Sequence, residues 1–163
     1  MPARHEDGYY TADLISDILS RGHSSRLFCS LLKDQKLFSE INAYMTGCLD
    51  AGLFIVEGKP LPEVSIEQAE QAIWSELDKL KTDLVTDDEL TKVKNKVEST
   101  MVFSEMSLLD KAMNLAYFEL LGDADKVNTE IEKYMEVSAE NIRQQAQQIF
   151  RKENASTLYY IAN

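Results

Sequence analysis

Cysteine and histidine are both rare in this chain, which has two of each among 163 residues. Two cysteines are too few for a disulfide framework, and they lack the spacing of a zinc ribbon. Cys29 falls in a predicted helix and Cys48 in a predicted strand, so we expect buried, unreactive thiols in a reducing compartment. Neither His5 nor His23 lies in an H-E-x-x-H or H-x-x-E-H pattern, the spacings that turn two imidazoles toward one metal. The sequence therefore predicts no metal ligand and no catalytic residue, with His5 in a mobile terminus and His23 as a solvent-exposed or capping residue.

Long apolar runs, glycine-rich loops and positive charge are also lacking. No run approaches the ~18 apolar residues that cross a bilayer, and a polar stretch follows Met1 where a secretory signal would be apolar. We therefore expect a soluble, cytoplasmic protein with no membrane partner. No phosphate-binding loop or G-x-S-x-G turn is present. The formal net charge of −11 argues against nucleic acid, because phosphate binding needs clustered lysine and arginine.

The composition is that of a folded protein. Hydrophobic residues make up 44% of the chain and charged residues 28%, which is typical of a globular domain and not of a disordered tail. No internal repeat, low-complexity tract or linker divides the sequence. We expect residues 1–163 to form a single domain.

Helical periodicity covers most of the chain. Apolar residues recur at helical spacing in seven segments: 9–20, 24–36, 65–80, 86–101, 107–121, 125–134 and 138–150. Ser65 and Thr86 each begin a capping-box pattern, and Ser24 or Ser25 is expected to cap the second helix. The segment 107–121 is the most thoroughly apolar, so we expect it to be the most buried helix.

Period-two alternation predicts a hairpin. Residues 40–48 alternate between apolar and polar, and a second apolar run follows at 53–56. The prolines of 59–62 are expected to end the sheet, and the β-branched and aromatic segment 157–161 is predicted to be a third strand. This order predicts an α+β fold with a largely antiparallel sheet and helices packed on one face. Because three strands are few for such a sheet, we expect that its first strand lies outside this sequence, that residues 1–4 are the tail of that strand, and that the chain is excised from a longer one.

The motif Ser25-Arg26-Leu27-Phe28, preceded by Leu19-Ser20-Arg21-Gly22-His23-Ser24, resembles the pitrilysin-family stretch L-G-G-G-x-S-S-R-L-F. The order helix, loop, helix, hairpin agrees with that family. Later segments resemble its further helices, including Val137-Ser138-Ala139-Glu140-Asn141-Ile142. On these motifs the chain is identified as resembling the pitrilysin/insulinase (M16) zinc peptidases, and the likeness covers nearly its whole length.

The resemblance implies a division of labour. Members of the family pair related α/β domains around a peptide chamber; the zinc motif lies in the N-terminal domain, and the C-terminal domain lacks the metal. This chain resembles the C-terminal domain. The expected partners are thus a zinc-bearing N-terminal-type domain, in the same chain or in another, and a peptide substrate; a homodimer is a further candidate. No cofactor is expected in this segment, and zinc is expected in the partner domain.

Two positions depart from the family pattern. Active members often carry an Arg and a Tyr that hold the substrate backbone, and the matching positions are Leu32 and Ser39. Leu32 cannot donate the hydrogen bonds of a guanidinium, and Ser39 is too short to replace a phenol. Tyr44, Thr46 and Phe54, near the hairpin, are further candidates for peptide contact, with packing in the sheet as the alternative role of each.

Three functional interpretations remain open at this point. In the first, the domain is inactive alone but completes the chamber of a zinc peptidase, where the hairpin edge binds peptide by strand addition. In the second, it is a purely structural or assembly domain of an inactive M16-like protein. In the third, it is an unrelated helical binding module. A zinc motif in a preceding domain or partner chain would favour the first.

Overall fold

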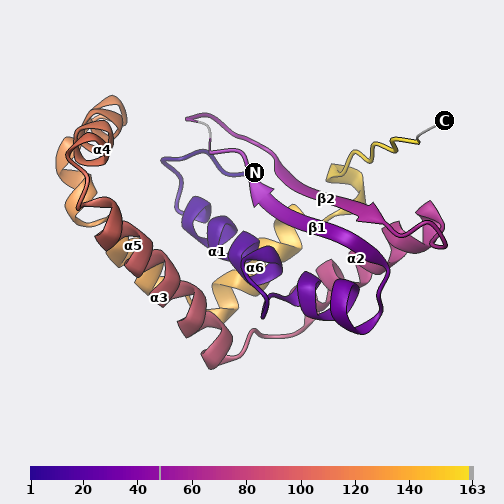
Figure 1. The fold of residues 1–163 in the computed structure, drawn as a ribbon. Helices are drawn as coiled ribbons and strands as arrows, with labels where there is room; N and C mark the ends of the chain where they lie inside the picture. Colours follow the sequence, from indigo (N-terminus) through magenta and orange to yellow (C-terminus); the bar gives the residue numbers. More distant parts are fainter. Residues whose placement is uncertain (48, 162–163) are drawn as a thin grey trace.

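The computed structural model describes residues 1–47 and 49–161, so the prediction for Cys48 lies outside the described residues. Helices and one hairpin follow one another along the chain (Figure 1). The elements are α1 (Gly8–Ser20), a π-helical segment (Phe28–Asp34), β1 (Phe38–Met45), β2 (Phe54–Pro60), α2 (Ile66–Thr82), α3 (Asp87–Ser104), α4 (Leu108–Leu120), a 3₁₀ turn (Ala124–Asn128), α5 (Glu130–Glu136), α6 (Ala139–Ile149) and a second 3₁₀ turn (Lys152–Asn154). The predicted α+β class is confirmed.

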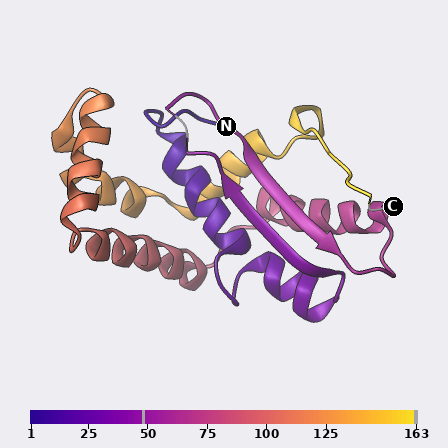
Figure 2. The same cartoon turned by 45° about the horizontal axis from the view of Figure 1, so that its top comes forward.

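The hairpin has helices on one of its faces. β1 and β2 pair antiparallel, with Ala43 opposite Val56 and Tyr44 opposite Ile55. Ile41 and Ala43 are buried while Tyr44 is exposed, as the alternating pattern predicts. Helix α1 packs against β1 and α6, and α6 packs against α2 (Figure 2). Helix α1 forms the centre of the hydrophobic core, since Leu14, Ile15, Ile18 and Leu19 are completely buried.

The prediction of a third strand is wrong. Residues 155–161 have no regular secondary structure, and within 1–47 and 49–161 the sheet consists of β1 and β2 alone. The C-terminal segment is held at α2 instead: the hydroxyls of Tyr159 and Thr157 donate to the Glu70 carboxylate at 2.6 and 3.3 Å. Leu158 and Tyr160 are more than nine-tenths exposed. A strand needs a backbone partner to form its ladder, and β-propensity alone does not supply one. β2 is longer than predicted, because Pro60 is its last residue and not the residue that interrupts it.

The prediction that helix 107–121 is the most buried is also wrong. In α4 only Phe118 is buried, and Leu108 and Leu109 are 85% and 68% exposed. The helix lies at one extremity of the molecule, beyond the end of α3 (Figure 1). By contrast, the predicted apolar faces of α2 and α3 are confirmed: Leu77, Leu80, Val93 and Val97 are buried. An apolar helix is buried only where another element covers it.

The start of the second helix differs from the prediction. Neither serine caps it: Ser25 Oγ is buried without a hydrogen-bond partner, and Ser24 accepts a hydrogen bond from Lys92 Nζ at 3.1 Å. The helix begins at Arg26 and widens to π geometry, with Gln35 N–H donating to Ser30 O at 2.9 Å. The predicted caps of α2 and α3 do form, since Ser65 and Thr86 accept from the backbone three residues on.

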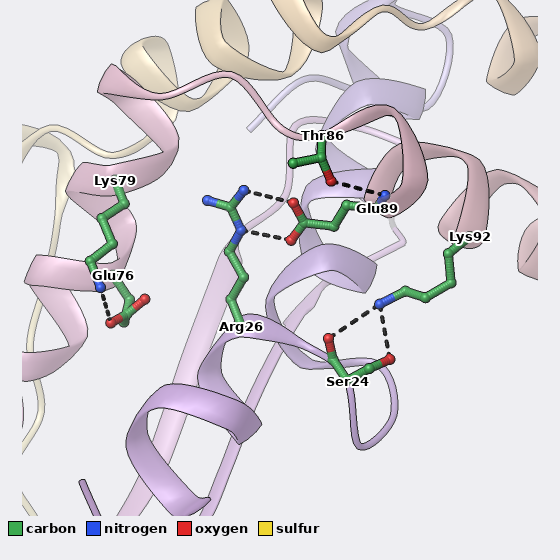
Figure 3. Close-up of polar contacts among 7 residues, drawn as sticks. All are labelled: Ser24, Arg26, Glu76, Lys79, Thr86, Glu89 and Lys92. Atoms are coloured by element: carbon green, nitrogen blue, oxygen red, sulfur yellow. Dashed lines mark hydrogen bonds and ion pairs between the residues drawn. The ribbon is translucent and has the colours of Figure 1, made fainter. Parts of the chain in front are cut away.

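Arg26 fastens this helix to α3. Its Nε and Nη2 donate to the two carboxylate oxygens of Glu89 at 2.7 and 2.8 Å (Figure 3). Both side chains are less than one-fifth exposed. The N–H of Glu89 donates to the Thr86 hydroxyl at 3.2 Å, so the Glu89 carboxylate serves Arg26 in place of the return bond of a capping box. The pairing lowers the pKa of Glu89.

The N-terminal residues are anchored and not a mobile terminus. Arg4 is buried, its guanidinium pairs with Glu130, and its Cζ lies 4.4 Å from the ring centroid of Tyr9 and 5.5 Å from that of Phe118. This cluster joins the first residues to α4 and α5. In the part of the chain that the structure describes, no helix has both the length and the apolar character needed to cross a membrane.

Candidate functional site

A cleft of about 420 Å³ runs between α1 and the outer edge of β1. From α1 and its C-terminal end it is lined by Asp13, Ser16, Asp17, Ser20, Arg21 and Gly22, and from β1 by Ala43, Tyr44 and Met45. Helix α1 supplies polar residues here because its apolar residues occupy the opposite face, in the core. The helix ends at Ser20, and Gly22 adopts the left-handed conformation with φ of 87° that turns the chain away.

The backbone of β1 faces this cleft at alternate residues. Thr46 N–H donates to Leu53 O at 2.9 Å, so the even-numbered residues 42, 44 and 46 bond toward β2. By that alternation, Ala43 and Met45 direct their N–H and C=O groups to the outer edge. The Ser20 hydroxyl already donates to the Ala43 carbonyl at 2.7 Å. The cleft thus contains backbone groups arranged as at the edge of a sheet, where an extended peptide could pair.

Two carboxylates make the cleft acidic. Asp17 is 6% exposed, and burial raises its pKa to about 6, although Arg21 Nη1 donates to it at 3.1 Å and opposes the shift. The neighbouring carboxylate of Asp13 raises it further. Asp13 itself accepts from the Tyr134 hydroxyl at 2.7 Å, and burial raises the pKa of that phenol, which stays a donor. These groups favour a cationic ligand over an anionic one.

The structure separates the predicted peptide-contact residues. Tyr44 lines the cleft, is 41% exposed, and its hydroxyl lies 3.4 Å from Glu57 across the hairpin. Thr46 is half-buried at the end of β1, where its hydroxyl accepts from Leu53 N–H at 2.8 Å. Phe54 packs into the core against Phe150, with ring centroids 5.1 Å apart. Tyr44 alone among these three lines the cleft.

The two positions that depart from the family pattern lie outside the cleft. Leu32 is in the π-helical segment, half-buried and packed against the core. Ser39 is exposed on β1, where its hydroxyl donates to Lys59 O at 3.1 Å. The register between β1 and β2 shifts at this point, between Phe38 and Glu40.

No metal-binding constellation is found where the structure gives coordinates. Across residues 1–47 and 49–161, no three His, Cys, Asp or Glu residues lie so as to hold one ion. His23 is exposed and contacts the Phe28 ring edge-on at 4.8 Å. Cys29 is half-buried, not fully buried as predicted, and its Sγ contacts the carbonyl of His23 at 3.4 Å. These residues do not fit a zinc site.

Sequence reasoning did not identify the acidic side of the cleft. Asp13 and Asp17 fall on the polar side of the predicted helix 9–20, which is ordinarily a solvated face. Only the structure shows that Asp17 is buried and that this face of α1 borders a cleft shared with β1. The alternating pattern of β1 and the four-residue spacing of Asp13 and Asp17 do not indicate that this strand and this face of the helix lie side by side.

Comparison with known proteins agrees with this architecture. The family model for the peptidase M16 inactive domain matches residues 1–97. No curated protein sequence matches the chain significantly. Among solved structures, a candidate zinc protease from Bordetella pertussis Tohama I superposes with a TM-score of 0.88 at 21% identity, covering 100% of this chain and 89% of that one.

Two further structures show the same fold. The inactive peptidase domain of a candidate zinc protease from Bordetella parapertussis has a TM-score of 0.88 at 20% identity, with 99% of this chain and 87% of that one covered. A protease from Helicobacter pylori has a TM-score of 0.83 at 22% identity, with 91% of this chain covered. The chain spans 36% of that protease. The match over residues 1–97 confirms the resemblance inferred from the motif at Ser25–Phe28, and the chain belongs to the peptidase M16 inactive domain family.

Proposed function

We propose that this chain is the non-catalytic half of the substrate chamber of an M16-type zinc peptidase, and that it holds an extended peptide along the outer edge of β1. Residues 1–163 act as one domain that pairs with a zinc-bearing domain, either in the same polypeptide or in a partner chain. Peptide cleavage belongs to the complete enzyme. The zinc ligands come from the partner domain.

The observation that carries the proposal is the cleft beside β1. Its wall offers the outward backbone groups of Ala43 and Met45, and its floor carries Asp13 and Asp17. Strand addition draws affinity from backbone hydrogen bonds, so it does not require the Arg and Tyr that Leu32 and Ser39 replace. The acidic floor favours peptides with lysine or arginine near the paired residues.

Met45 allows a direct test of strand addition. Met45→Pro removes an outward N–H without removing a bond to β2, whereas Met45→Thr changes the side chain and keeps the N–H. Binding of a fluorescein-labelled alternating valine–lysine peptide is measured by anisotropy, with circular dichroism to confirm folding. We expect Met45→Pro to weaken binding by about tenfold, since one hydrogen bond contributes about 1.4 kcal/mol, and Met45→Thr to bind as the wild type does. Equal binding by both variants would refute strand addition at this edge.

A mixing experiment tests the role in catalysis. The chain alone should hydrolyse no peptide, and it should raise the rate of a zinc-bearing M16 domain with which it associates, because positioning of substrate lowers the barrier. The alternative is a scaffold, which the departures at Leu32 and Ser39 favour. Unchanged rates in a demonstrated complex would support the scaffold and overturn the proposed function.

A further inference from the structure

The largest unexplained feature of the molecule is the apolar surface of α4 and the end of α3. The most exposed of its large side chains are Phe103, Met106, Leu108, Leu109, Met113 and Leu120, with exposures from 61% to 85%. Monomeric proteins rarely leave so many large apolar side chains adjacent to one another in water. The acidic cleft and the β1 edge, to which the proposed function assigns the peptide, lie elsewhere.

One continuous stripe runs along α4. We define the α4 stripe as Leu109, Ala112, Met113, Ala116 and Leu120, which follow the helical spacing of one face. All five are exposed and none is charged. Phe118, which is buried near Arg4, is two residues from both Ala116 and Leu120 and therefore lies on the opposite face. The helix is attached to the body by one face and presents the α4 stripe away from it.

The α4 stripe is complementary to itself in antiparallel orientation. If two copies of α4 cross at the midpoint between Asn114 and Leu115, Leu109 of each copy lies level with Leu120 of the other. The same register sets Met113 opposite Ala116, a large side chain against a small one. Alanines at the centre permit helix axes to approach to about 8 Å, the close end of the usual range. A stripe that serves a different protein has no need of this internal symmetry, whereas a twofold dimer requires it.

The charged flanks are compatible with the same arrangement. Asp110 and Glu119 lie on opposite sides of the α4 stripe by the helical angle of 100° per residue. In a twofold antiparallel pair, each flank meets the identical flank of the other helix. Asp110 of one copy and Glu119 of the other, although level, are thus kept on opposite sides of the seam. The position of α4 at an extremity, seen in both Figure 1 and Figure 2, leaves room for a second molecule.

The total exposed area is consistent with an interface of this kind. The chain exposes 10201 Å², whereas a compact monomer of 18.5 kDa exposes about 8200 Å². The difference of about 2000 Å² exceeds the ~800 Å² that each partner contributes to an interface of standard size. From the symmetry of the α4 stripe and this surplus, we propose that α4 is a homodimer seam, occupied by α4 of a second copy in antiparallel orientation.

Sedimentation equilibrium tests whether the seam exists. The wild-type chain should approach twice 18.5 kDa with rising concentration, and Met113→Glu should remain at 18.5 kDa because it buries a charge in the centre of the seam. Met113 is 61% exposed, so this variant keeps its fold, as circular dichroism will verify. The matched control is Leu158→Glu, at an equally exposed apolar position far from α4, which should dimerise as the wild type does. A monomeric wild type, a dimeric Met113→Glu, or a monomeric Leu158→Glu overturns the proposal.

Disulfide trapping tests the antiparallel register. In a Cys29→Ala/Cys48→Ala background, Leu109→Cys and Leu120→Cys are oxidised separately and as a mixture. Residues 109 of the two copies are about 17 Å apart in the antiparallel register, too far for a disulfide, whereas 109 of one copy lies beside 120 of the other. We expect covalent dimers in the mixture and not in the separate samples. Dimers from Leu109→Cys alone would indicate parallel packing, and capture of this surface by a zinc-bearing domain with no self-association would indicate a different occupant; either result overturns the inference.

Discussion

At the scale of single residues, the motif that carries the family resemblance has a structural role. Arg26 of Ser25–Phe28 reaches Glu89, which is distant in sequence, and joins the second helix to the start of α3 (Figure 3). The sequence shows a capping pattern from Thr86 to Glu89, and this predicted the helix start correctly. It could not show that the Glu89 carboxylate turns to Arg26, because that contact depends on the packing of two helices. The fold thus gives Arg26 of this motif a structural role.

Arg26→Lys should destabilise the domain although the charge is kept. A lysine cannot reproduce the two parallel bonds of a guanidinium, and the pair is mostly buried, so we expect the free energy of unfolding to fall by about 1–2 kcal/mol. Urea denaturation at pH 7 measures the change. Arg151→Lys, which alters an exposed arginine, should change the free energy of unfolding by less than about 0.5 kcal/mol. Equal effects of the two substitutions would contradict the structural role of the pair.

Asp17→Asn should make the protein more stable at neutral pH. The pKa of Asp17 is about 6 in the folded state and 3.8 for the unperturbed group, so the folded form binds the extra proton between these values. The stability from this group is complete below pH 4 and is lost as the pH rises through 6. Asparagine avoids that loss. The shift of about two units already includes the opposing effect of Arg21 and corresponds to at most ~3 kcal/mol. We expect a gain of about 1–2 kcal/mol above pH 6 and none at pH 4.

Chemical denaturation from pH 4 to pH 7 would follow this effect. Asp50→Asn, in the exposed turn of the hairpin, is the control and should track the wild type throughout. A gain for Asp17→Asn that is the same at pH 4 and pH 7 would argue against burial of the charge as its cause.

Leu32→Arg and Ser39→Tyr restore the residue types of the family pattern and should differ in their effect. Leu32 packs against the core, so an arginine there is expected to reduce the free energy of unfolding by about 1–3 kcal/mol. Ser39 is exposed, and tyrosine should be tolerated. Thermal denaturation compares them. If Leu32→Arg keeps the wild-type melting temperature and the double variant raises peptide turnover in the complete enzyme, position 32 faces the chamber after all.

At the scale of elements, local sequence patterns correctly predicted the features that depend on residues close together in the sequence. The hairpin, the starts of α2 and α3, and the glycine that ends α4 all follow from alternation, caps and the left-handed conformation of Gly122 with φ of 97°. Two of the wrong predictions, a buried α4 and a third strand at 157–161, have one cause. Periodicity and β-propensity tell which face is apolar but not whether another part of the chain covers it.

Ending the chain after Asn154 should leave the fold almost unchanged. The segment from Ala155 to Ile161 forms no ladder, and its contacts to Glu70 are exposed side-chain bonds. We expect a loss of less than about 1 kcal/mol in the free energy of unfolding. Tyr159→Phe in the full chain is the control for the strongest of these bonds. A loss of several kcal/mol on truncation, far beyond that of Tyr159→Phe, would mean that this segment is paired in solution as a strand.

At the scale of the whole molecule, the chain has the exposed surface expected of a domain that other protein covers. It buries a core around α1, yet it exposes about 2000 Å² more than a compact monomer of its mass. The β1 edge and the α4 stripe are separate exposed surfaces of the molecule. Sequence reasoning found the family, the missing zinc motif and the hairpin edge as a candidate for peptide binding. It could not locate the acidic cleft beside β1 or the α4 stripe, because each depends on which faces the tertiary structure leaves open.

Purified protein should contain no stoichiometric zinc. Neither histidine belongs to a metal-binding cluster where the structure gives coordinates, and stable zinc sites need three or four protein ligands. Elemental analysis after dialysis measures the metal, and the His5→Ala/His23→Ala variant is the control for weak surface binding. Zinc near one per chain that disappears in this variant would overturn the proposed division of labour, in which a partner domain holds the metal.

The enclosure of Arg4 has a mechanical consequence. Its guanidinium is held by Glu130 and by aromatic rings that include Phe118 of α4, so the backbone at residue 4 moves with the body of the domain. A polypeptide joined ahead of Met1 would be connected only three residues from this anchored residue, so its motion relative to the domain would be restricted. A force applied at residue 4 would reach α4 through the contact of Arg4 with Phe118, so the orientation of a preceding polypeptide and that of α4 would be coupled.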